Sequence, residues 1–483
     1  MSVQVSAGSA GSFKSLVKSR LKALIAFLRP AQSASIDDDS DDEAAGADTA
    51  SAGRAGLYAL AIRLANAAIA YITQIIFARM LGEFEYGIFA LGWVWIAILG
   101  HTSTFGFSMS SIRFLAQYEA TGEKDHAVGF FRFSLLVPLV TSGLAAIIGV
   151  LLLKSGALPI PDYYIFPLIL AAVCVPLFAL QDMMESYARA RHWIMLALVP
   201  TYLLRHGFLG LFLVLAIVFG FEGNAVTALI VAAVAIGGSL AIQAALLARR
   251  YLAERRALPQ QVKPAYQRRM WLKTSAPLAL QDGASLLVSY SDILVLSFFV
   301  PPAQIGIYFA ATRIAQIVGF VRFAASAGTA NVFSKLNAQG KREELKSLSR
   351  ATIRISFWLS FIACAVLAVM GPFLLKLFGA GFATGYPVLL ILMIGLLVQA
   401  AFSSAEDLLN MTGHQGMTAS SYFGALLVNL VLNLALIPYF GLMGAAVATS
   451  LSIGFRVFYL AFGVRSRLGI SLFGAQFKRQ RGS

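Results

Sequence analysis

Long apolar stretches limit the folds open to this 483-residue chain more than any other feature of its sequence. A helix needs about 20 apolar residues to cross the hydrocarbon core of a bilayer. Twelve stretches reach that length: 56–79, 87–110, 132–153, 163–185, 194–219, 224–248, 274–298, 305–330, 351–375, 385–409, 417–438 and 442–463. Backbone groups in hydrocarbon must be bonded inside the structure, which favours helices. We therefore predict an all-α integral membrane protein with about twelve transmembrane helices.

The second half of the chain repeats motifs of the first half. Phe84–Phe89 is matched about 219 residues later by Ala303–Tyr308, with glycine, isoleucine and an aromatic residue in the same places. Ala120–Glu123 returns as Ala338–Lys341, and Phe219–Gly223 as Phe440–Gly444, at nearly the same offset. Such a repeat indicates two tandem six-helix bundles. We place them at 56–248 and 274–464, joined by a linker at 249–273 and followed by a basic tail at 465–483.

The first 55 residues differ in character from the spans. Residues 13–28 place leucines on one helical face and lysines on another, which suits either a helix lying on an anionic membrane surface or a solvated tail. The acidic run 37–43 and the alanine- and glycine-rich residues after it predict a disordered linker.

Charge is scarce and its location is informative. Hydrophobic residues make up 58% and charged residues 13% of the chain, against about a quarter charged in soluble domains. The net charge of +15 lies mostly in the even-numbered connections and the tail, which indicates cytoplasmic loops rather than nucleic-acid binding. Both termini are therefore expected in the cytoplasm.

Motifs for catalysis or cofactors are missing from the sequence. There is no G-x-x-x-x-G-K-[ST] and no H-E-x-x-H, and the two cysteines, Cys174 and Cys364, both lie in apolar runs. We expect no catalytic residues, no metal site and no cofactor.

Polar side chains inside the spans are the candidate functional residues, because each costs free energy unless it is paired or hydrated. Arg63 and Gln74 point within about 20° of each other on the first span. The residues expected to line a cationic substrate cavity are Arg63, Asn66, Gln74, His101, Arg205, His206, Arg313 and Arg322. Only one of Arg313 and Arg322 can face the cavity, because nine residues separate them. Salt bridges between helices are the alternative role. Asp282 and Asp292 of the seventh span are candidates for ion coupling.

A second set of charged residues follows the repeat. Glu185 and Glu406 are 221 residues apart and end spans four and ten. We expect them to form a cytoplasmic gate with nearby cations, chiefly Arg113 and Arg189, with Arg456 as a further partner.

The segments Ala78–Ala90 and Ser111–Ala116, together with twelve spans in two halves, resemble the polysaccharide flippases of the multidrug/oligosaccharidyl-lipid/polysaccharide (MOP) exporter superfamily. The resemblance implies two bundles around a central, water-filled cavity and transport by alternating access. It implies an oligosaccharide linked to polyprenyl pyrophosphate as substrate, and a role in polysaccharide or lipopolysaccharide biosynthesis at the bacterial inner (plasma) membrane. Membrane lipids and the polymerase and export proteins of that process are the further partners it implies.

Two other functions fit parts of the sequence. A cation-coupled multidrug antiporter of the same superfamily would share the topology and would use buried carboxylates such as Asp282 and Asp292. A membrane-embedded transferase would need an acid–base pair facing water, and none with suitable spacing is found.

Overall fold

The computed structural model describes residues 42–157, 159–256, 263–470 and 472, and the basic segment 13–28 lies outside them. The chain divides into two compact units, Met1–Ala61 and Ile62–Ser483. In the first unit, the structure describes only the helical residues from Asp42 onward. The disordered linker expected from the acidic run 37–43 onward is helical in its described part, because helix α2 begins at Asp42. Alanine, the strongest helix former, is frequent in this stretch.

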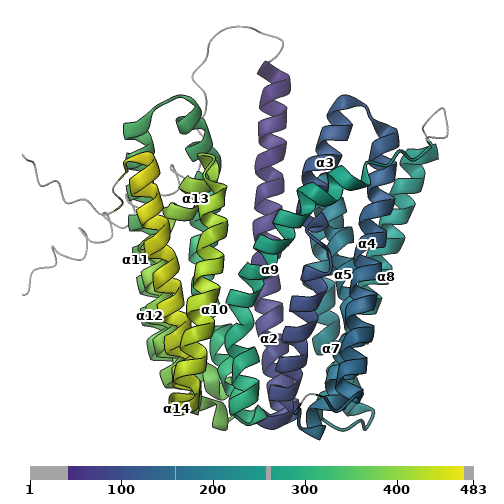
Figure 1. Ribbon diagram of the computed structural model, residues 1–483, viewed down its shortest axis with the longest axis vertical. Coiled ribbons are helices and arrows are strands. Elements are labelled where there is room, and N and C mark those ends of the chain that lie inside the picture. Colours follow the sequence, from purple (N-terminus) through teal and green to yellow (C-terminus); the bar gives the residue numbers. More distant parts are fainter. Residues whose placement is uncertain (1–41, 158, 257–262, 471, 473–483) are drawn as a thin grey trace, which may run out of the picture. The chain divides into compact units, whose positions relative to one another are not determined.

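The described residues of the first half form α-helices joined by short connections (Figure 1). They are α2 (Asp42–Thr102), α3 (Phe107–Thr121), α4 (Lys124–Lys154), α5 (Asp162–Ala190), α6 (Ile194–Leu198), the π-helix η1 (Val199–Leu204), α7 (Arg205–Val218) and α8 (Ala225–Arg256).

The second half repeats this arrangement. Its elements are α9 (Arg268–Phe299), α10 (Pro302–Ala338), α11 (Arg342–Phe378), the 3₁₀-helix η2 (Gly381–Gly385), α12 (Tyr386–Ala400), α13 (Ser404–Met411), α14 (Gln415–Gly463) and η3 (Val464–Leu468). The expected linker 249–273 is shorter in the structure, because α8 continues to Arg256 and α9 begins at Arg268.

Two helices each contain two crossings. α2 breaks at Gly82 (φ 75°) and α14 at Gly441 (φ 53°), a backbone conformation that glycine adopts without steric cost. Nine helices of the described chain are long and apolar enough to cross a membrane, including the bent stretches Ile62–Thr121 and Gln415–Leu468. Counting each bent stretch twice and adding the 37-residue α10 gives twelve crossings. The predicted all-α membrane fold is confirmed.

Several predicted spans are interrupted. The second span stops at Thr102 and resumes at Phe107, with Phe105 (φ 51°) and Gly106 (φ 74°) in the left-handed region. The fifth span contains η1, and the tenth is split between α12 and α13. Hydropathy reports only length and composition, and therefore did not reveal these breaks.

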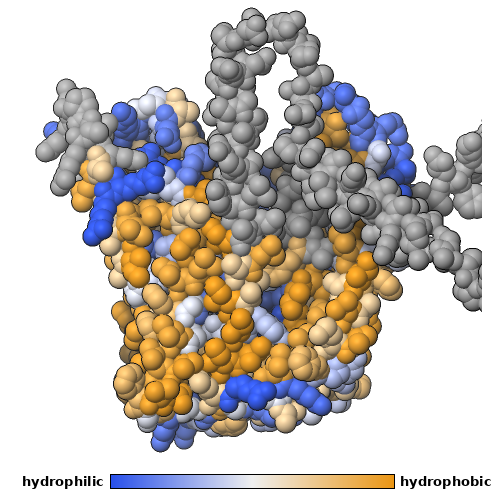
Figure 2. All heavy atoms as spheres, turned by 180° about the vertical axis from the view of Figure 1, so that it is seen from behind, coloured by the Kyte–Doolittle hydropathy of each residue, from blue (hydrophilic) through white to orange (hydrophobic). Residues whose placement is uncertain are grey.

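The connections between crossings gather at two ends. At the Gly82 end, the Glu85 carboxylate accepts a hydrogen bond from the Ala225 amide (2.8 Å). At the opposite Thr121 end, the Ala265 amide donates to the Asp125 carbonyl (3.0 Å). Figure 2 shows a broad hydrophobic belt between hydrophilic ends on the face that it draws. This pattern suits a bilayer around the belt.

Helix α9 connects the two halves. Its first turns pack on α3, where the Trp271 indole donates to Tyr118 (2.8 Å) and the Ser275 and Ser110 hydroxyls lie 2.7 Å apart. Its last turns pack on α14, where Ser291 donates to Asn429 (2.6 Å). In Figure 1, α9 accordingly runs obliquely from the helices of the first half to those of the second.

The halves also meet at the Gly82 end through the repeated glycines. A Cβ atom on Gly87 would overlap the carbonyl oxygen of Pro302 and lie 3.1 Å from the Gly306 nitrogen. A Cβ on Gly306 would lie 2.7 Å from the Glu83 oxygen and 3.1 Å from the Gly87 nitrogen. Only glycine allows the two backbones to approach this closely.

Candidate substrate cavity and ion-pair network

A cavity of about 210 Å³ lies between the two halves. α2 and α7 line it from the first half and α10 lines it from the second. The lining residues are Asn66, Ala67, Ala70, Tyr71, Gln74, Trp93, His206, Arg313, Gln316, Ile317 and Phe320. The structure thus brings together four of the residues selected from the sequence: Asn66, Gln74, His206 and Arg313.

Arg313 is the cation of this cavity. Its Nη1 donates to Gln316 Oε1 (3.0 Å), and its guanidinium lies 4.1 Å from the ring centre of Phe309. Its Nε and Nη2 are buried without a hydrogen-bond partner. A buried donor without a partner costs free energy, and the planar guanidinium fork matches two oxygens of a phosphate or carboxylate. Arg313 is therefore available to bind an anion.

The first half presents polar groups held by their neighbours. Gln74 Oε1 accepts a hydrogen bond from Tyr86 (2.8 Å), which leaves its amide NH₂ available to donate. His206 Nδ1 lies 3.0 Å from the Tyr202 carbonyl oxygen, which leaves Nε2 for the cavity. The Asn66 Oδ1 and the Tyr71 hydroxyl are buried without a partner. Hydrogen-bonding capacity therefore lies opposite Arg313.

His206 owes its position to an irregular helix. The π-helix η1 ends directly before α7, and π-helical turns occur often at functional sites. The Thr73 hydroxyl donates to the His206 carbonyl (3.0 Å). This bond ties the start of α7 to the first span.

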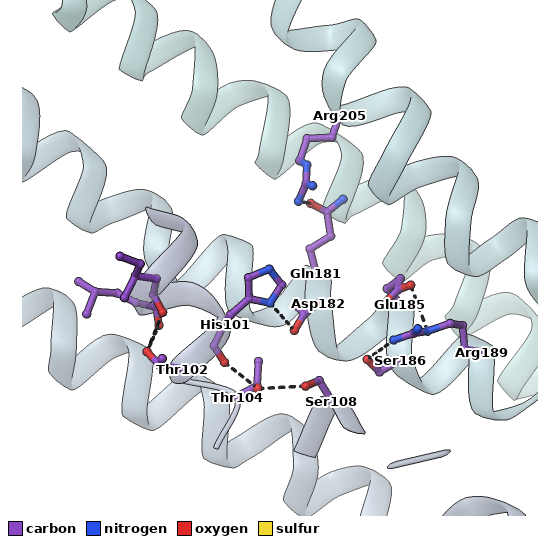
Figure 3. A network of polar contacts seen from close by, with 12 residues as sticks. His101, Thr102, Thr104, Ser108, Gln181, Asp182, Glu185, Ser186, Arg189 and Arg205 are labelled. Carbon is purple, nitrogen blue, oxygen red and sulfur yellow. Dashed lines mark hydrogen bonds and ion pairs between the residues drawn. The ribbon is translucent and has the colours of Figure 1, made fainter. Parts of the chain in front are cut away.

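His101 and Arg205 are not among the cavity-lining residues and belong to a neighbouring network (Figure 3). His101 Nδ1 lies 3.2 Å from Asp182 Oδ2. Arg205 Nη1 lies 3.5 Å from Gln181 Oε1, and the Gln181 amide donates to Ser239 (2.8 Å). Asp182 and Gln181 were not selected from the sequence, because spacing along one helix does not show which residue of another helix it meets.

Arg63 is not among the described residues that line the cavity. The Arg63 guanidinium is half-buried and lies 6.0 Å from the Tyr202 ring centre. Arg322 lies on α10, but its side chain is outside the described part of the structure.

The two predicted gate glutamates each pair within their own half. Glu185 pairs with Arg189 on α5 (3.1 Å). Glu406 pairs with Arg456 of α14 (2.8 Å) and accepts a hydrogen bond from Tyr422 (3.1 Å).

Arg113, the other expected gate cation, is exposed on α3. The pairs that the structure shows therefore join α5 to itself and α13 to α14. They do not join one half to the other.

Asp292 is the centre of a buried polar cluster in the second half. Its carboxylate accepts hydrogen bonds from Tyr308 (2.5 Å), the Ile293 amide (2.8 Å) and Thr449 (3.3 Å). Asn429 accepts from Asn433 (2.7 Å) and lies 3.4 Å from Thr449. The spacing of two asparagines by four residues in an apolar run was the sequence signal for this cluster, and it was missed. Asp282 is half-buried on α9, next to Gly283, whose Cβ position lies 3.4 Å from the Thr102 methyl group of the first half.

Twelve helical crossings in two repeated halves, with a polar cavity between them, define a multi-pass membrane transporter. The fold is similar to that of a multidrug resistance MATE family transporter of the MOP superfamily in an inward-facing conformation (TM-score 0.71, 14% identity, 83% of this chain and 94% of that chain). It is also similar to the lipid II flippase MurJ (TM-score 0.63, 15% identity, 85% and 87%).

Residues 52–336 match the family described as polysaccharide biosynthesis protein, and the chain belongs to this family. Residues 277–435 also match the MatE family. The predicted relationship to flippases of the MOP superfamily is confirmed, and it is a relationship to transporters rather than enzymes.

Two curated relatives come from Haloferax volcanii. They are the probable flippase AglR (27% identical over 196 residues, 39% of this chain and 41% of that protein) and the probable low-salt glycan biosynthesis flippase Agl15 (26% over 165 residues, 34% and 35%). The matched region thus spans about two fifths or less of the length of these relatives.

Proposed function

We propose that this protein translocates oligosaccharide linked to polyprenyl pyrophosphate across the membrane by alternating access, for polysaccharide or lipopolysaccharide biosynthesis. The observation that carries this proposal is the half-buried Arg313, whose Nε and Nη2 are buried without a hydrogen-bond partner in a cavity between the halves. A pyrophosphate needs a cationic partner in the membrane, because its charge cannot enter hydrocarbon unaided.

The cavity size suggests which part of the substrate it holds in this conformation. Its volume of about 210 Å³ matches a head group such as pyrophosphate better than a whole oligosaccharide. We therefore infer that Arg313 holds the head group, with Gln74, His206 and Asn66 opposite, and that the glycan enters only when the halves separate further.

The charge distribution supports an orientation. Arginines and lysines collect in the connections of the Thr121 end, so we propose that this end and both termini face the cytoplasm. We place the protein in the plasma membrane. The curated relatives are archaeal, and they do not argue for a bacterial membrane in particular.

Several predicted residues keep proposed roles around the cavity. Arg63 and Arg205 add positive charge near Tyr202 and Phe178, from which they lie 6.0 and 4.8 Å. Asp282 and Asp292 remain candidates for ion coupling. The Glu185–Arg189 and Glu406–Arg456 pairs remain candidates for a gate, with Arg113 close by in sequence to the Thr121 end. Polymerase and export proteins remain proposed partners.

A cation-coupled multidrug antiporter is the second candidate. The MatE match over residues 277–435 and the buried Asp292 favour it. The described lining of the cavity, however, includes Arg313 and His206 and no carboxylate. A cationic drug would therefore meet a repulsive charge there, which is why we rank the anionic substrate first.

The test is binding of a polyprenyl pyrophosphate-linked oligosaccharide to purified protein in nanodiscs. Arg313→Ala should weaken binding by about 10- to 150-fold, because hydrogen bonds to charged groups contribute about 1.5–3 kcal/mol. Arg313→Lys should recover part of the affinity, since lysine keeps the charge but not the fork. Arg354→Ala, which removes an exposed arginine of α11, is the matched control and should bind normally.

Unchanged affinity in Arg313→Ala would refute the assignment of this cavity. Tighter binding of a cationic drug by wild type, abolished in Asp292→Asn, would support the antiporter instead.

A further inference from the structure

A groove of about 770 Å³ on the surface of the second half takes no part in the proposed substrate binding. Helices α11, α12 and α14 form it, and α12 packs on both of the others (Figure 1). We propose that this groove binds an anionic phospholipid, with an acyl chain in the groove and the phosphate at Arg465. The site goes beyond the proposed transport function, because its lining shares no residue with that of the substrate cavity.

Each of the three helices turns one apolar face toward the groove. Phe357 and Phe361 of α11 form one wall, and Phe458, Ala461 and Phe462 of α14 form the other, at spacings of three or four residues. α12 adds a third face between them, with Ile394, Leu397, Val398 and Ala401. Lipid tails are as apolar as these side chains, so van der Waals contact on three sides is what distinguishes the groove from a convex lipid-facing surface.

The groove lies within the depth of one leaflet. The last stretch of α14 begins at Gly441, where a Cβ would lie 3.9 Å from Gln304 of the Gly82 end, and it continues for about 30 Å toward the Thr121 end. The lining residues from Phe458 to Arg465 cover about 10 Å of that length. Half of the hydrocarbon core measures about 15 Å. The groove therefore fits an acyl chain from the leaflet at the Thr121 end.

Arg465 provides a positive charge where the groove ends. It follows Phe462 by three residues, is exposed and lines the groove, whose described lining contains no carboxylate. On α11, Arg350 lies seven residues before Phe357 and thus on the same helical face, and its Nε is buried without a hydrogen-bond partner. Cations at the membrane surface attract anionic head groups. The ammonium of a zwitterionic head group would meet repulsion from Arg465.

Three other occupants fit the groove less well. The chain after Leu472, which itself lines the groove, carries Lys478, Arg479 and Arg481 and no acidic residue, so it offers Arg465 no partner. A second copy of the chain would bring a second cation to the same place. The polyprenyl carrier of the proposed substrate would bring a phosphate, but the cavity proposed for that phosphate is lined by α2, α7 and α10.

The test is a titration of the full-length protein in detergent, without substrate, followed by native mass spectrometry. The probes are phosphatidylglycerol and phosphatidylethanolamine with identical acyl chains. Wild type should bind the first phosphatidylglycerol about fivefold more tightly, the factor expected for one arginine beside an anionic head group. Arg465→Gln should remove this preference, whereas Arg465→Lys should keep it because the charge remains.

Two further variants separate the groove from general surface charge. Arg467→Gln is the matched control, because Arg467 is exposed on the same short helix η3 but does not line the groove, and its preference should equal that of wild type. Ala461→Phe fills the groove without changing its charge, so it should weaken binding of both lipids. Melting temperatures without added lipid check that each variant is folded. Arg465→Gln changes an exposed side chain, so the test does not depend on Ala461→Phe alone.

Equal affinity of wild type for the two lipids would overturn the proposal. Equal losses in Arg465→Gln and Arg467→Gln would do the same, because they would show attraction to the surface in general. Unchanged binding in Ala461→Phe would place the lipid elsewhere. Polyprenyl phosphate that binds more tightly than phosphatidylglycerol, and is lost in Ala461→Phe, would assign the groove to the carrier; a dimer lost in that variant would assign it to a second copy.

The lipid site can be tested apart from the substrate cavity. Arg313 lies on α10 and does not line the groove, so Arg313→Ala should bind phosphatidylglycerol like wild type. Failure of the substrate assignment would therefore leave this result untouched.

Discussion

The contact between the two halves at the Gly82 end depends on one residue, Gly87. Its missing side chain allows the start of α10 to lie against the Gly82 end of the first half. The preceding residue, Tyr86, is fully buried, and its ring centre lies 5.7 to 6.5 Å from those of Phe309, Phe378 and Phe382 of the second half. Aromatic packing therefore contributes to the same contact between the halves.

Gly87→Ala should therefore destabilise the protein by about 1–3 kcal/mol, the usual cost of overpacking. Thermal unfolding in detergent, followed by tryptophan fluorescence, measures this effect. Gly149→Ala in α4 is the control: a Cβ there meets nothing within 4 Å, and alanine favours the helix. Equal melting temperatures for the two variants would show that the backbone contact at Gly87 is unimportant.

Sequence periodicity predicted the site residues that lie on the same face of a single helix. Asn66 and Gln74 share a face of the first span, and both line the cavity. His101 shows the limit. Its place on the second span was clear, but its partner Asp182 lies 81 residues further along the chain. Pairing between distant helices depends on packing angles, which sequence periodicity does not contain.

Helix α9 has a distinctive role because its first turns pack on α3 of the first half and its last turns on α14 of the second. The hydroxyls of Ser110 and Ser275 form one of the buried hydrogen bonds between α9 and α3. Removing one partner leaves the other buried without a bond, at a cost of about 1–3 kcal/mol. Removing both should cost less than the sum.

We therefore expect Ser275→Ala and Ser110→Ala each to lower thermal stability, and Ser110→Ala/Ser275→Ala to lie close to either single variant. Melting temperatures of all four proteins complete the double-mutant cycle. Strictly additive effects would mean that the two hydroxyls act independently and that α9 is held to α3 by other contacts.

Helix existence was readable from the sequence, whereas helix continuity was not. Twelve apolar runs predicted twelve crossings, because each run must be long enough for the bilayer. The turn at Gly82 falls between two predicted spans, 56–79 and 87–110, whereas the break at Ser103–Gly106 is short and lies inside an apolar run. Positive φ values at glycine arise from the contacts that the glycine makes, and hydropathy contains no record of them.

Across the full chain, the separation of connections into two ends gives a topology that can be measured. Single cysteines at Ser155 and Thr384, which are exposed in odd-numbered connections, should react with a membrane-impermeant maleimide added outside intact cells. Cysteines at Thr121 and Gln339 should react only after the membrane is opened. The native Cys174 and Cys364 are buried, so background labelling should be low. The reverse pattern would invert the orientation proposed from the loop charges.

The contact between Gly87 and Gly306 also shows where the two-fold axis that relates the two halves passes. The two glycines occupy equivalent positions of the repeat, and in a pair related by a two-fold rotation only residues near the axis touch their own equivalents. Each half has six crossings, an even number, so both halves enter the membrane in the same direction and the axis runs along the membrane normal. The interface between the halves thus has the form of an isologous dimer interface. This form is expected if two copies of one six-helix subunit paired through this glycine before they were fused. A chain built from two copies of the first half would place Gly87 against Gly87 and retain the contact.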